Sequence, residues 1–477
     1  MMRRYSAALL VLVASAGCML GPDYSRPYLT TPPSFRDAPE ETASIADMPW
    51  WEVFRDETLQ ALVRESLESS RALDAAIADM ERARGLAAAQ RGELFPTFGT
   101  IGNAAREKKA SLGALDPQAD FDDERSTYAG ALAVAWEADV WGRLRRASEA
   151  SRADLLASDA VRRGVVLSLV TGIAQSYLEL RELDLELEIS QRTVRSFQAT
   201  YELFDRQFRG GVTSKLDALR AEGALAQAAA TVPLVEQRIR AKENEIAVLL
   251  GRPPGPIERG PVLLALALPP QIPAGVPSLL LQRRPDLIEA EQNLMAATAR
   301  VGVAYTSFFP RIGLSAFYGS LSSDLSDFLG AGTKAWSRSG TVGGPIFSFG
   351  RNYYTWEAAK AANEGAVAVY QQTVLTALAD VSNALTAREK VTLQRQNLER
   401  QVRALQEAST FAEKRYVGGL ATYLEVLDAQ QQLFPAELAL AQTLRDERLV
   451  VVNLYRALGG GWNQAGDAPT VPNALKP

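Results

Sequence analysis

The longest regular pattern of apolar residues begins near residue 143 and runs to Phe208 without an internal proline. Its apolar positions recur at alternating steps of three and four, the spacing of a helix that packs along a seam. The seam contains Ile173, Leu180, Leu183, Leu187, Val194, Phe197, Tyr201, Phe204 and Phe208, interrupted by Ser176 and Ser190. Further apolar residues off the seam (Leu178, Leu185, Ile189) indicate a second buried side. The pattern predicts one coiled-coil helix, roughly 100 Å long at about 1.5 Å per residue, within a layered bundle or ring.

Residues 126 to 136 have a different period, in which large and small side chains alternate. The large residues fall on one face and alanines on the other, as in a strand with two apolar faces. A weaker strand pattern at 97 to 105, with a polar loop between, predicts a β-hairpin from about 95 to 140. Upstream, apolar residues at helical spacing predict a helical stretch from about residue 51 to residue 91.

The long helix is predicted to end in the stretch RQFRGGVTSKLDALRAE, residues 206 to 222. Gly210 and Gly211 favour the left-handed conformation that ends a helix. Ser214, with Asp217 three residues later, has the pattern of a capping box that starts the next helix. The stretch therefore predicts the tip of a helical hairpin at about 209 to 215.

The same pattern returns as KRYVGGLATYLEVLDAQ at residues 414 to 430, an offset of 208 from position 206 to position 414. Gly418 and Gly419 repeat the glycine pair, and Thr422 with Glu425 repeats the capping box. This predicts a second tip at about 417 to 423.

The rest of the chain repeats as well, which predicts a tandem duplication of helix, β-hairpin, long helix, tip and helix. The motif WGR at 141 to 143 corresponds to FGR at 349 to 351, and LFP at 94 to 96 corresponds to FFP at 308 to 310. The predicted divisions are a signal peptide at 1–17, an extended segment at 18–49, a first repeat at 50–255, a proline-rich connector at 256–277, a second repeat at 278–462 with its hairpin at about 309–350, and a tail at 463–477. Pro233 and Pro435 lie inside the returning helices, which they are expected to kink or locally open.

The composition excludes several classes of protein. The chain carries 51 Lys and Arg against 56 Asp and Glu, with no basic block of the kind that follows nucleic acid. It contains no histidine, the commonest general base and metal ligand. There is also no phosphate-binding glycine loop, nucleophile elbow or metal-ligand spacing. We therefore expect no catalytic residues, no metal site and no cofactor, and the chain is predicted not to be an enzyme.

The N-terminus has the layout of a secretory signal, with a basic start and the apolar run AALLVLVASA at 7 to 16. The run is too short to span a bilayer. It ends in SAGC, which resembles a bacterial lipobox and makes Cys18 the expected site of lipidation and the first residue of the mature protein. An ordinary signal peptide with a chance cysteine is the alternative. Because Met19, not aspartate, follows Cys18, sorting to the outer membrane is expected.

The hairpins constrain how many chains act together. Two hairpins supply four strands, whereas even small membrane barrels need about eight. Open strand edges are not tolerated in lipid. Several chains are therefore expected to share one barrel that continues into a helical cylinder.

Five stretches carry a resemblance to a known family. They are PWWEVFRDETLQALV at 49–63, WEADVWGRLRR at 136–146, LQRRPDLIEAE at 281–291, GGPIFSFGR at 343–351 and RYVGGLATYLEVLDAQ at 415–430. Together they resemble the outer membrane efflux protein family of the TolC and OprM type, in particular its NodT-like lipoprotein branch associated with resistance-nodulation-division (RND) pumps.

The resemblance implies a mainly α-helical protein with a membrane β-barrel: a homotrimer with twelve strands in the outer membrane, continuing into an α-helical barrel in the periplasm. It implies a passive exit duct for drugs or other small substrates. It also implies a part in multidrug resistance. The implied partners are a periplasmic adaptor, which would contact the tips at Gly210, Gly211, Ser214, Gly418, Gly419 and Thr422, and an inner-membrane RND transporter. The covalent lipid on Cys18, such as palmitate, is the one group the chain is expected to carry.

The resemblance also implies a periplasmic gate in the second tip. By position, Tyr416 and Asp428 match the gate tyrosine and aspartate of the family, and Glu425 lies one turn before Asp428. Three copies of Asp428 brought close together would repel one another unless protonated, cation-bound or paired. Gln431 stands where relatives often have arginine, so a charged lock between helices is expected to be missing.

One alternative has a different function. A lipid-anchored periplasmic coiled-coil scaffold would explain the heptad seam, but it has no use for an apolar β-hairpin. The cargo, and the particular adaptor and pump, cannot be read from the sequence.

Overall fold

The computed structural model describes residues 19–29, 56–108, 124–266 and 283–460. The elements are α3 (Glu57–Ser69), α4 (Arg71–Gly92), β1 (Thr97–Lys108), β2 (Glu124–Ala138), α5 (Arg143–Arg209), α6 (Lys215–Leu249), η2 (Leu263–Ala265), α8 (Pro285–Thr306), β3 (Arg311–Ser322), η3 (Ala331–Thr333), β4 (Lys334–Gly343), α9 (Arg351–Val417) and α10 (Tyr423–Ala457). Cys18 and the ranges 30–55, 109–123, 267–282 and 461–477 lie outside the described residues, so the predictions that fall on them are not addressed by the structure.

The two halves of the chain contain matching helices. α5 and α9 are each 67 residues long, α6 and α10 each 35, and α4 and α8 each 22. The single helix of about 65 residues predicted from the heptad seam is therefore confirmed. Pro233 and Pro435 lie inside α6 and α10, and both helices continue past them. The equal lengths agree with the predicted tandem duplication.

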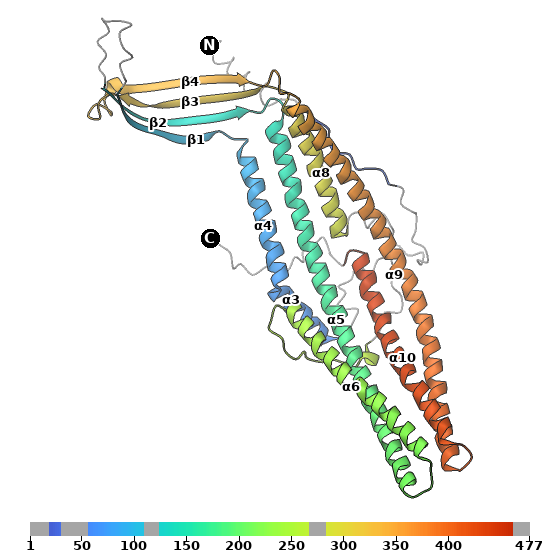
Figure 1. Ribbon diagram of the computed structural model, residues 1–477. Helices are drawn as coiled ribbons and strands as arrows, with labels where there is room; N and C mark the ends of the chain where they lie inside the picture. The colour runs from blue at the N-terminus through green and yellow to red at the C-terminus, as the bar shows by residue number, and fades with distance from the viewer. Residues whose placement is uncertain (1–18, 30–55, 109–123, 267–282, 461–477) are drawn as a thin grey trace. The chain divides into compact units, whose positions relative to one another are not determined.

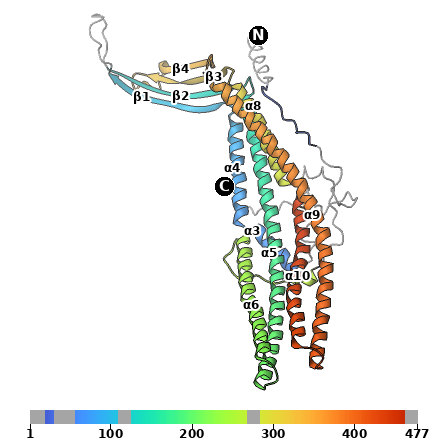
Figure 2. The same cartoon turned by 45° about the vertical axis from the view of Figure 1, so that its right-hand side comes forward.

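The chain divides into two compact units. The first comprises Met1–Pro27, Met80–Ser158 and Ala290–Tyr370 and contains the β-sheet. The second comprises Tyr28–Asp79, Asp159–Glu289 and Gln371–Pro477 and contains α6, α10 and the parts of α5 and α9 that adjoin them (Figure 2). In the described residues, no helix is both long enough and apolar enough to cross a membrane.

The sheet of the first unit has the strand order β1-β2-β3-β4, all antiparallel (Figure 1). Both predicted hairpins are present, and β2 of the first hairpin pairs with β3 of the second. One long edge of β1 and one of β4 have no partner among the described strands. The sheet is therefore open on both sides.

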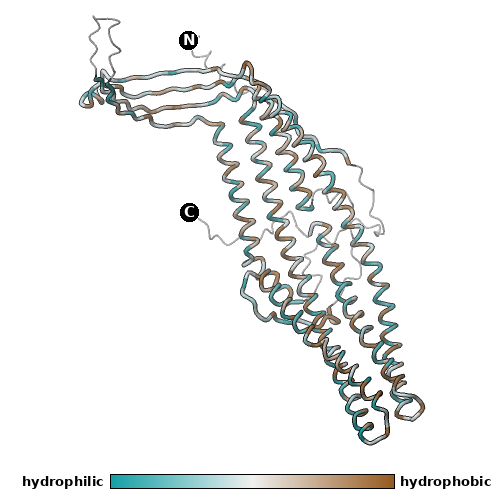
Figure 3. The backbone as a smooth tube through the Cα atoms, viewed as in Figure 1, coloured by the Kyte–Doolittle hydropathy of each residue, from teal (hydrophilic) through white to brown (hydrophobic). Residues whose placement is uncertain are grey.

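The register gives the two faces of the sheet different chemistry. Thr100, Leu132, Tyr318 and Trp336 are direct cross-strand neighbours and share one face, on which Leu132 and Trp336 are 67% and 68% exposed. The opposite face carries mostly small and hydroxyl side chains, such as the row Thr97, Ala135, Ser315 and Ser339. It also carries the exposed apolar residues Ile101, Phe317 and Leu321. Figure 3 shows the resulting short alternation of hydrophobic and hydrophilic positions along the strands. The expectation of two apolar faces, made from β2 alone, holds only in part: β3 and β4 bring serines to the alanine face beside its apolar residues.

The helical stretch predicted over 51 to 91 is divided into two helices, α3 and α4, over its described residues. Ser70 has an extended conformation (φ −67°, ψ 123°) that separates α3 from α4. The break accommodates the end of α6: the hydroxyl of Ser69 donates to the carbonyl of Leu250 at 2.6 Å. Gly251, at φ +70°, lies so close that a Cβ there would be 2.2 Å from the Ser69 carbonyl oxygen. A long-range contact therefore interrupts a locally helical sequence.

A buried polar contact joins α3 to α5 in the second unit. The hydroxyl of Tyr177, on α5, donates to the carboxylate of Asp56 at 2.8 Å and accepts the backbone N–H of Gly260 at 3.0 Å. The other Asp56 oxygen accepts the N–H groups of Thr58 and Leu59 and caps α3. Burial and the Asp56 carboxylate raise the pKa of Tyr177, so its hydroxyl stays protonated as a donor.

We predict that Tyr177→Phe lowers the stability of the second unit by about 1–3 kcal/mol, because it leaves buried polar groups without their partner. Thermal loss of the helical circular dichroism signal measures the effect as a lower Tm. Tyr28→Phe is the matched control, since Tyr28 is 89% exposed. Equal melting of the two variants would contradict the role given to the Tyr177 hydroxyl.

Candidate functional site at the helical tips

Each long helix ends in the same backbone motif. At the first tip, Val212 N–H donates to the carbonyl of Gln207 at 2.8 Å and Gly211 N–H to that of Phe208 at 2.9 Å. These two bonds form a Schellman cap, with Gly211 at φ +72° in the left-handed position. Gly210 precedes it with its N–H bonded to Arg206. The glycine pair thus ends the helix as the sequence predicts.

The second tip repeats this geometry. Leu420 N–H donates to the carbonyl of Arg415 at 2.8 Å and Gly419 N–H to that of Tyr416 at 2.9 Å. Gly419 has φ +71°, and nothing lies within 4 Å of the place its Cβ would take. Gly418 donates its N–H to Lys414. Both turns are therefore fixed by backbone bonds, and their outer surfaces are open.

The helices that follow the turns begin differently. Ser214 accepts the N–H of Asp217 at 3.2 Å, which is the N-cap half of the predicted capping box. The Asp217 carboxylate accepts the Ser214 hydroxyl at 2.6 Å, in place of the Ser214 backbone N–H that a full capping box would use. Thr422 occupies the same position before α10 but makes no side-chain cap bond. The capping box predicted for Thr422 and Glu425 is wrong.

Arg415 explains the difference between the tips. Its guanidinium pairs with the Glu425 carboxylate at 3.3 Å and donates to the carbonyl of Leu420. Glu425 is therefore drawn across the turn toward the end of α9 and away from Thr422. The sequence offered no sign of this contact except that an arginine ends the last full turn of α9.

Tyr416 contacts the first tip. Its hydroxyl donates to Gln207 Oε1, on α5, at 3.2 Å. Its ring lies 5.9 Å from the rings of both Phe204 and Tyr423, which are themselves 3.9 Å apart. This aromatic group sits in a buried cluster that we call the tip core: Phe197, Phe204, Ala218, Ala221, Ala224, Ala228, Ala412, Tyr423, Val426, Leu427 and Ala429. Gln207 and Tyr423 were not singled out from the sequence.

Asp428 points away from the tip core. Its neighbours Leu427 and Ala429 are buried, whereas Asp428 is exposed. Its carboxylate accepts a hydrogen bond from Gln432 at 2.7 Å. Gln431 is exposed as well. Among the described residues, neither a hydrogen bond nor an ion pair joins Asp428 to Tyr416 or Glu425, so one chain does not bring the three predicted gate residues into contact.

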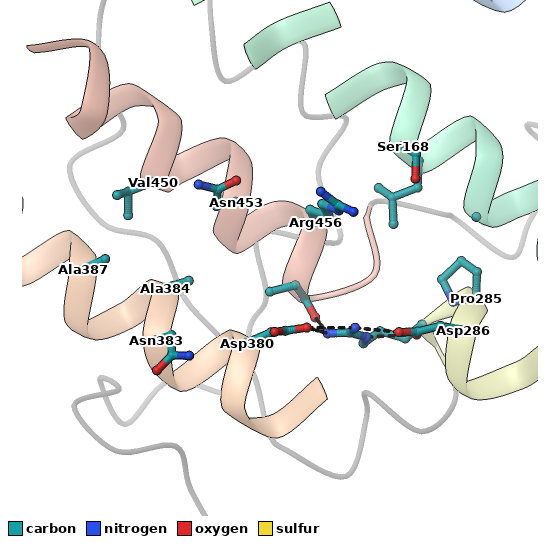
Figure 4. Close-up of a pocket in the computed structure, with 14 residues that line it drawn as sticks. Ser168, Pro285, Asp286, Asp380, Asn383, Ala384, Ala387, Val450, Asn453 and Arg456 are labelled. Carbon is teal, nitrogen blue, oxygen red and sulfur yellow. Dashed lines mark hydrogen bonds and ion pairs between the residues drawn. The ribbon is translucent and has the colours of Figure 1, made fainter. Parts of the chain in front are cut away.

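A separate cavity of about 580 Å³ lies in the second unit, away from the predicted site residues (Figure 4). Arg284 lies at its wall, 8% exposed, and its guanidinium contacts Asp286 and Asp380 at 2.6 and 3.1 Å. It also donates to the carbonyl of Ala457 at 3.0 Å. This part of the 281–291 motif therefore ties together the start of α8, the middle of α9 and the end of α10.

The last residue of the 281–291 motif, Glu291, binds residues of the first unit. Glu291 accepts two hydrogen bonds of 2.7 Å from Arg26 and one from the hydroxyl of Tyr24. Leu20 N–H donates to the carbonyl of Trp141 at 3.1 Å, close after the end of β2. The N-terminal segment at 19–29 is thus held against the elements that adjoin the sheet.

The comparisons with known proteins identify the family. The sequence profile described as Outer membrane efflux protein matches residues 62–252 and 276–460. The chain belongs to the outer membrane efflux protein family. The two matched ranges correspond to the two repeats.

Individual members align with this chain over nearly its full length. It is similar to the toluene efflux pump outer membrane protein TtgC of Pseudomonas putida, with 33% identity over 474 residues that cover 97% of each chain. It is 30% identical over 459 residues to the cation efflux system protein CusC of Escherichia coli, covering 95% of this chain and 98% of that one. The open state of the Neisseria gonorrhoeae MtrE outer membrane channel matches with a TM-score of 0.84 at 30% identity, covering 93% of this chain and 98% of that one.

As an outer membrane efflux protein, the chain is a passive channel and not an enzyme. Members of the family work with a periplasmic adaptor and an inner-membrane pump. The scaffold alternative is thereby set aside. Within the described ranges, no group of three or more acidic or cysteine side chains could hold a metal ion.

The unequal caps of the two tips give a direct prediction. Ser214→Ala should destabilise the first turn of α6 by about 1 kcal/mol, the usual cost of a lost N-cap. Thr422→Ala should cost less than half as much at α10, because no side-chain cap bond is lost there. Hydrogen exchange of the amides in the two first turns measures both effects, and equal losses of protection would contradict the assignment.

Proposed function

We propose that three copies of this chain form one exit duct, with a twelve-stranded barrel in the outer membrane and a helical barrel in the periplasm. The open sheet is the main support. Four strands are too few to close a membrane barrel, and unpaired edges are costly in lipid. Pairing β4 of one copy with β1 of the next would satisfy both edges in every copy.

The two faces of the sheet support the same arrangement. The face with Leu132, Tyr318 and Trp336 suits contact with lipid acyl chains, which accept apolar side chains. The face with Ser315 and Ser339, whose hydroxyls lie 2.7 Å apart, suits a water-filled lumen. A duct of this kind conducts passively, with energy supplied by the pump.

The partners and cargo are proposed from the family. We expect a periplasmic adaptor to bind the tips, where Val212, Val417 and Leu420 are 77%, 80% and 74% exposed. An inner-membrane RND transporter would deliver the cargo. Relatives that share this fold carry names referring to toluene and to cations, so the cargo is expected to be drugs or other small substrates selected mainly by the pump.

The gate is proposed to lie at the second tip, where Asp428 from three copies would meet around the threefold axis. Asp428 is exposed on α10, and its carboxylate accepts a hydrogen bond from Gln432. Three such carboxylates repel one another, which keeps the closed state only marginally stable. Tyr416, through Gln207, would hold α9 against α5, and Glu425, through Arg415, would keep the turn compact.

The lipid anchor is proposed at Cys18. The lipobox-like stretch that precedes it is one support. The other is the position of Leu20, two residues later, which bonds to Trp141 just after β2. A lipid on Cys18 would then be attached near the end of the strands, where a membrane surface is expected.

We predict that Asp428→Ala converts a small, flickering conductance into a large and steady one in planar bilayers, because it removes the charges proposed to form the gate. Glu413→Ala is the matched control: Glu413 is also an exposed acid of the α9–α10 hairpin but lies outside the predicted gate. Gating that is unchanged in Asp428→Ala, or changed equally in the control, would contradict the gate assignment. No conductance from any folded form would contradict the duct itself.

We also predict that Cys18→Ala abolishes incorporation of labelled palmitate. The variant chain should still assemble, because the barrel and not the lipid inserts it into the membrane. Export through a different signal peptide keeps the test independent of processing. Palmitate retained on the variant would contradict lipidation at Cys18.

A further inference from the structure

One acidic side chain in the second unit is buried without full compensation. Glu182, on α5, has a side chain 1% exposed, and its Oε2 lies 3.3 Å from the guanidinium of Arg445, on α10. Its other oxygen, Oε1, is buried and has no hydrogen-bond partner among the described residues. A buried carboxylate with a free oxygen is costly when charged.

Other buried acids of this unit are better paired. Glu437 receives Arg192 on one oxygen and Gln406 on the other, at 2.8 and 3.1 Å. Glu447 is contacted by Arg395 on both oxygens, at 3.1 and 3.0 Å. Glu182 is therefore the exception among the acids buried between these helices.

The charged groups around Glu182 are largely occupied elsewhere. Arg445 also binds Asp446 at 2.8 Å, and Arg238, on α6, binds Glu186 at 2.9 Å. Lys242, on α6, is held by Glu179 and Glu245 at 2.7 and 2.6 Å. Glu186 lies one turn after Glu182 on α5 and adds a like charge. No cation in this set is available to Glu182 alone.

These surroundings decide whether the contact between α10 and α5 becomes stronger or weaker as pH rises. Burial raises the pKa of Glu182 to about 7, opposed by Arg445 and aided by Glu186. If α10 separates from α5, the carboxyl meets water and its pKa returns to about 4.3. The docked state therefore binds a proton that the separated state releases, and docking weakens as pH rises between these two values.

We propose that Glu182 is a proton-operated latch, which holds α10 against α5 when protonated and releases α10 when ionised. The same helix carries Asp428, so release of α10 would favour opening of the tip. The link to opening rests on the proposed gate, whereas the contact between α5 and α10 does not. The duct would therefore close more tightly in acid.

Hydrogen exchange of α10 in the full-length protein in detergent tests the latch without any channel measurement. After correction for the intrinsic pH dependence of exchange, protection of the α10 amides should fall by up to tenfold per pH unit between about pH 5 and 7. Glu182→Gln, which mimics the protonated side chain, should keep α10 protected throughout. A wild-type profile without this fall, or an equal fall in Glu182→Gln, would overturn the proposal.

Substitutions at two residues next to Glu182 should move the pH midpoint for the loss of α10 protection in opposite directions. Arg445→Gln removes the opposing cation and should shift the midpoint to higher pH. Glu186→Gln removes a like charge and should shift it to lower pH. A merely structural role for these residues would give no such opposite shifts, and if Arg445→Gln fails to fold, Glu186→Gln alone decides. Glu437→Gln is the matched control and should leave the midpoint unchanged.

Conductance then tests whether the latch acts on the gate. Open probability should rise from pH 5 to 8 in the wild type and stay low in Glu182→Gln. Equal pH responses in these two forms, with the exchange result as predicted, would overturn the coupling to the gate. If no form conducts, Asp428→Ala included, the proposed function fails, and the exchange experiment still decides the latch.

Discussion

The unpaired edges of the four-stranded sheet are the constraint on which the rest of the account depends. Backbone groups at a strand edge must be paired inside a membrane, and one chain cannot pair its own β1 and β4 with so few strands. The apolar and hydroxyl faces of the sheet impose a second condition, since one must meet lipid and the other water. A barrel shared between copies satisfies both.

The two halves of the chain supply two matching helical hairpins, α5–α6 and α9–α10. Differences in sequence between the two tips give each hairpin its own side-chain contacts. The Schellman turns of the two tips are the same, but Ser214 caps its helix and Thr422 does not. At the second tip, Arg415 forms an ion pair with Glu425, and the hydroxyl of Tyr416 donates a hydrogen bond to Gln207 of the first tip. The second hairpin is therefore held by side-chain contacts that can be broken one at a time.

Local chemistry made much of this predictable from sequence. Glycine pairs mark the tips because φ near +70° is cheap for glycine, and the heptad seam marks the long helices. Contacts between distant residues could not be predicted. The break at Ser70 depends on Leu250 and Gly251, the hydroxyl face of the sheet depends on the register of β2 with β3, and the burial of Glu182 depends on the packing of α10. The gate residues were placed by resemblance, and their meeting requires neighbouring copies that a single chain does not contain.

The number of copies in the assembled protein tests the central claim most directly. Native mass spectrometry of the full-length chain, purified from outer membranes in mild detergent, measures that number. If three copies share one barrel, we expect a species with the mass of three chains that separates into single chains on heating in denaturing detergent. Stable single chains as the only folded species, or an assembly with another number of copies, would contradict a barrel built from three open sheets.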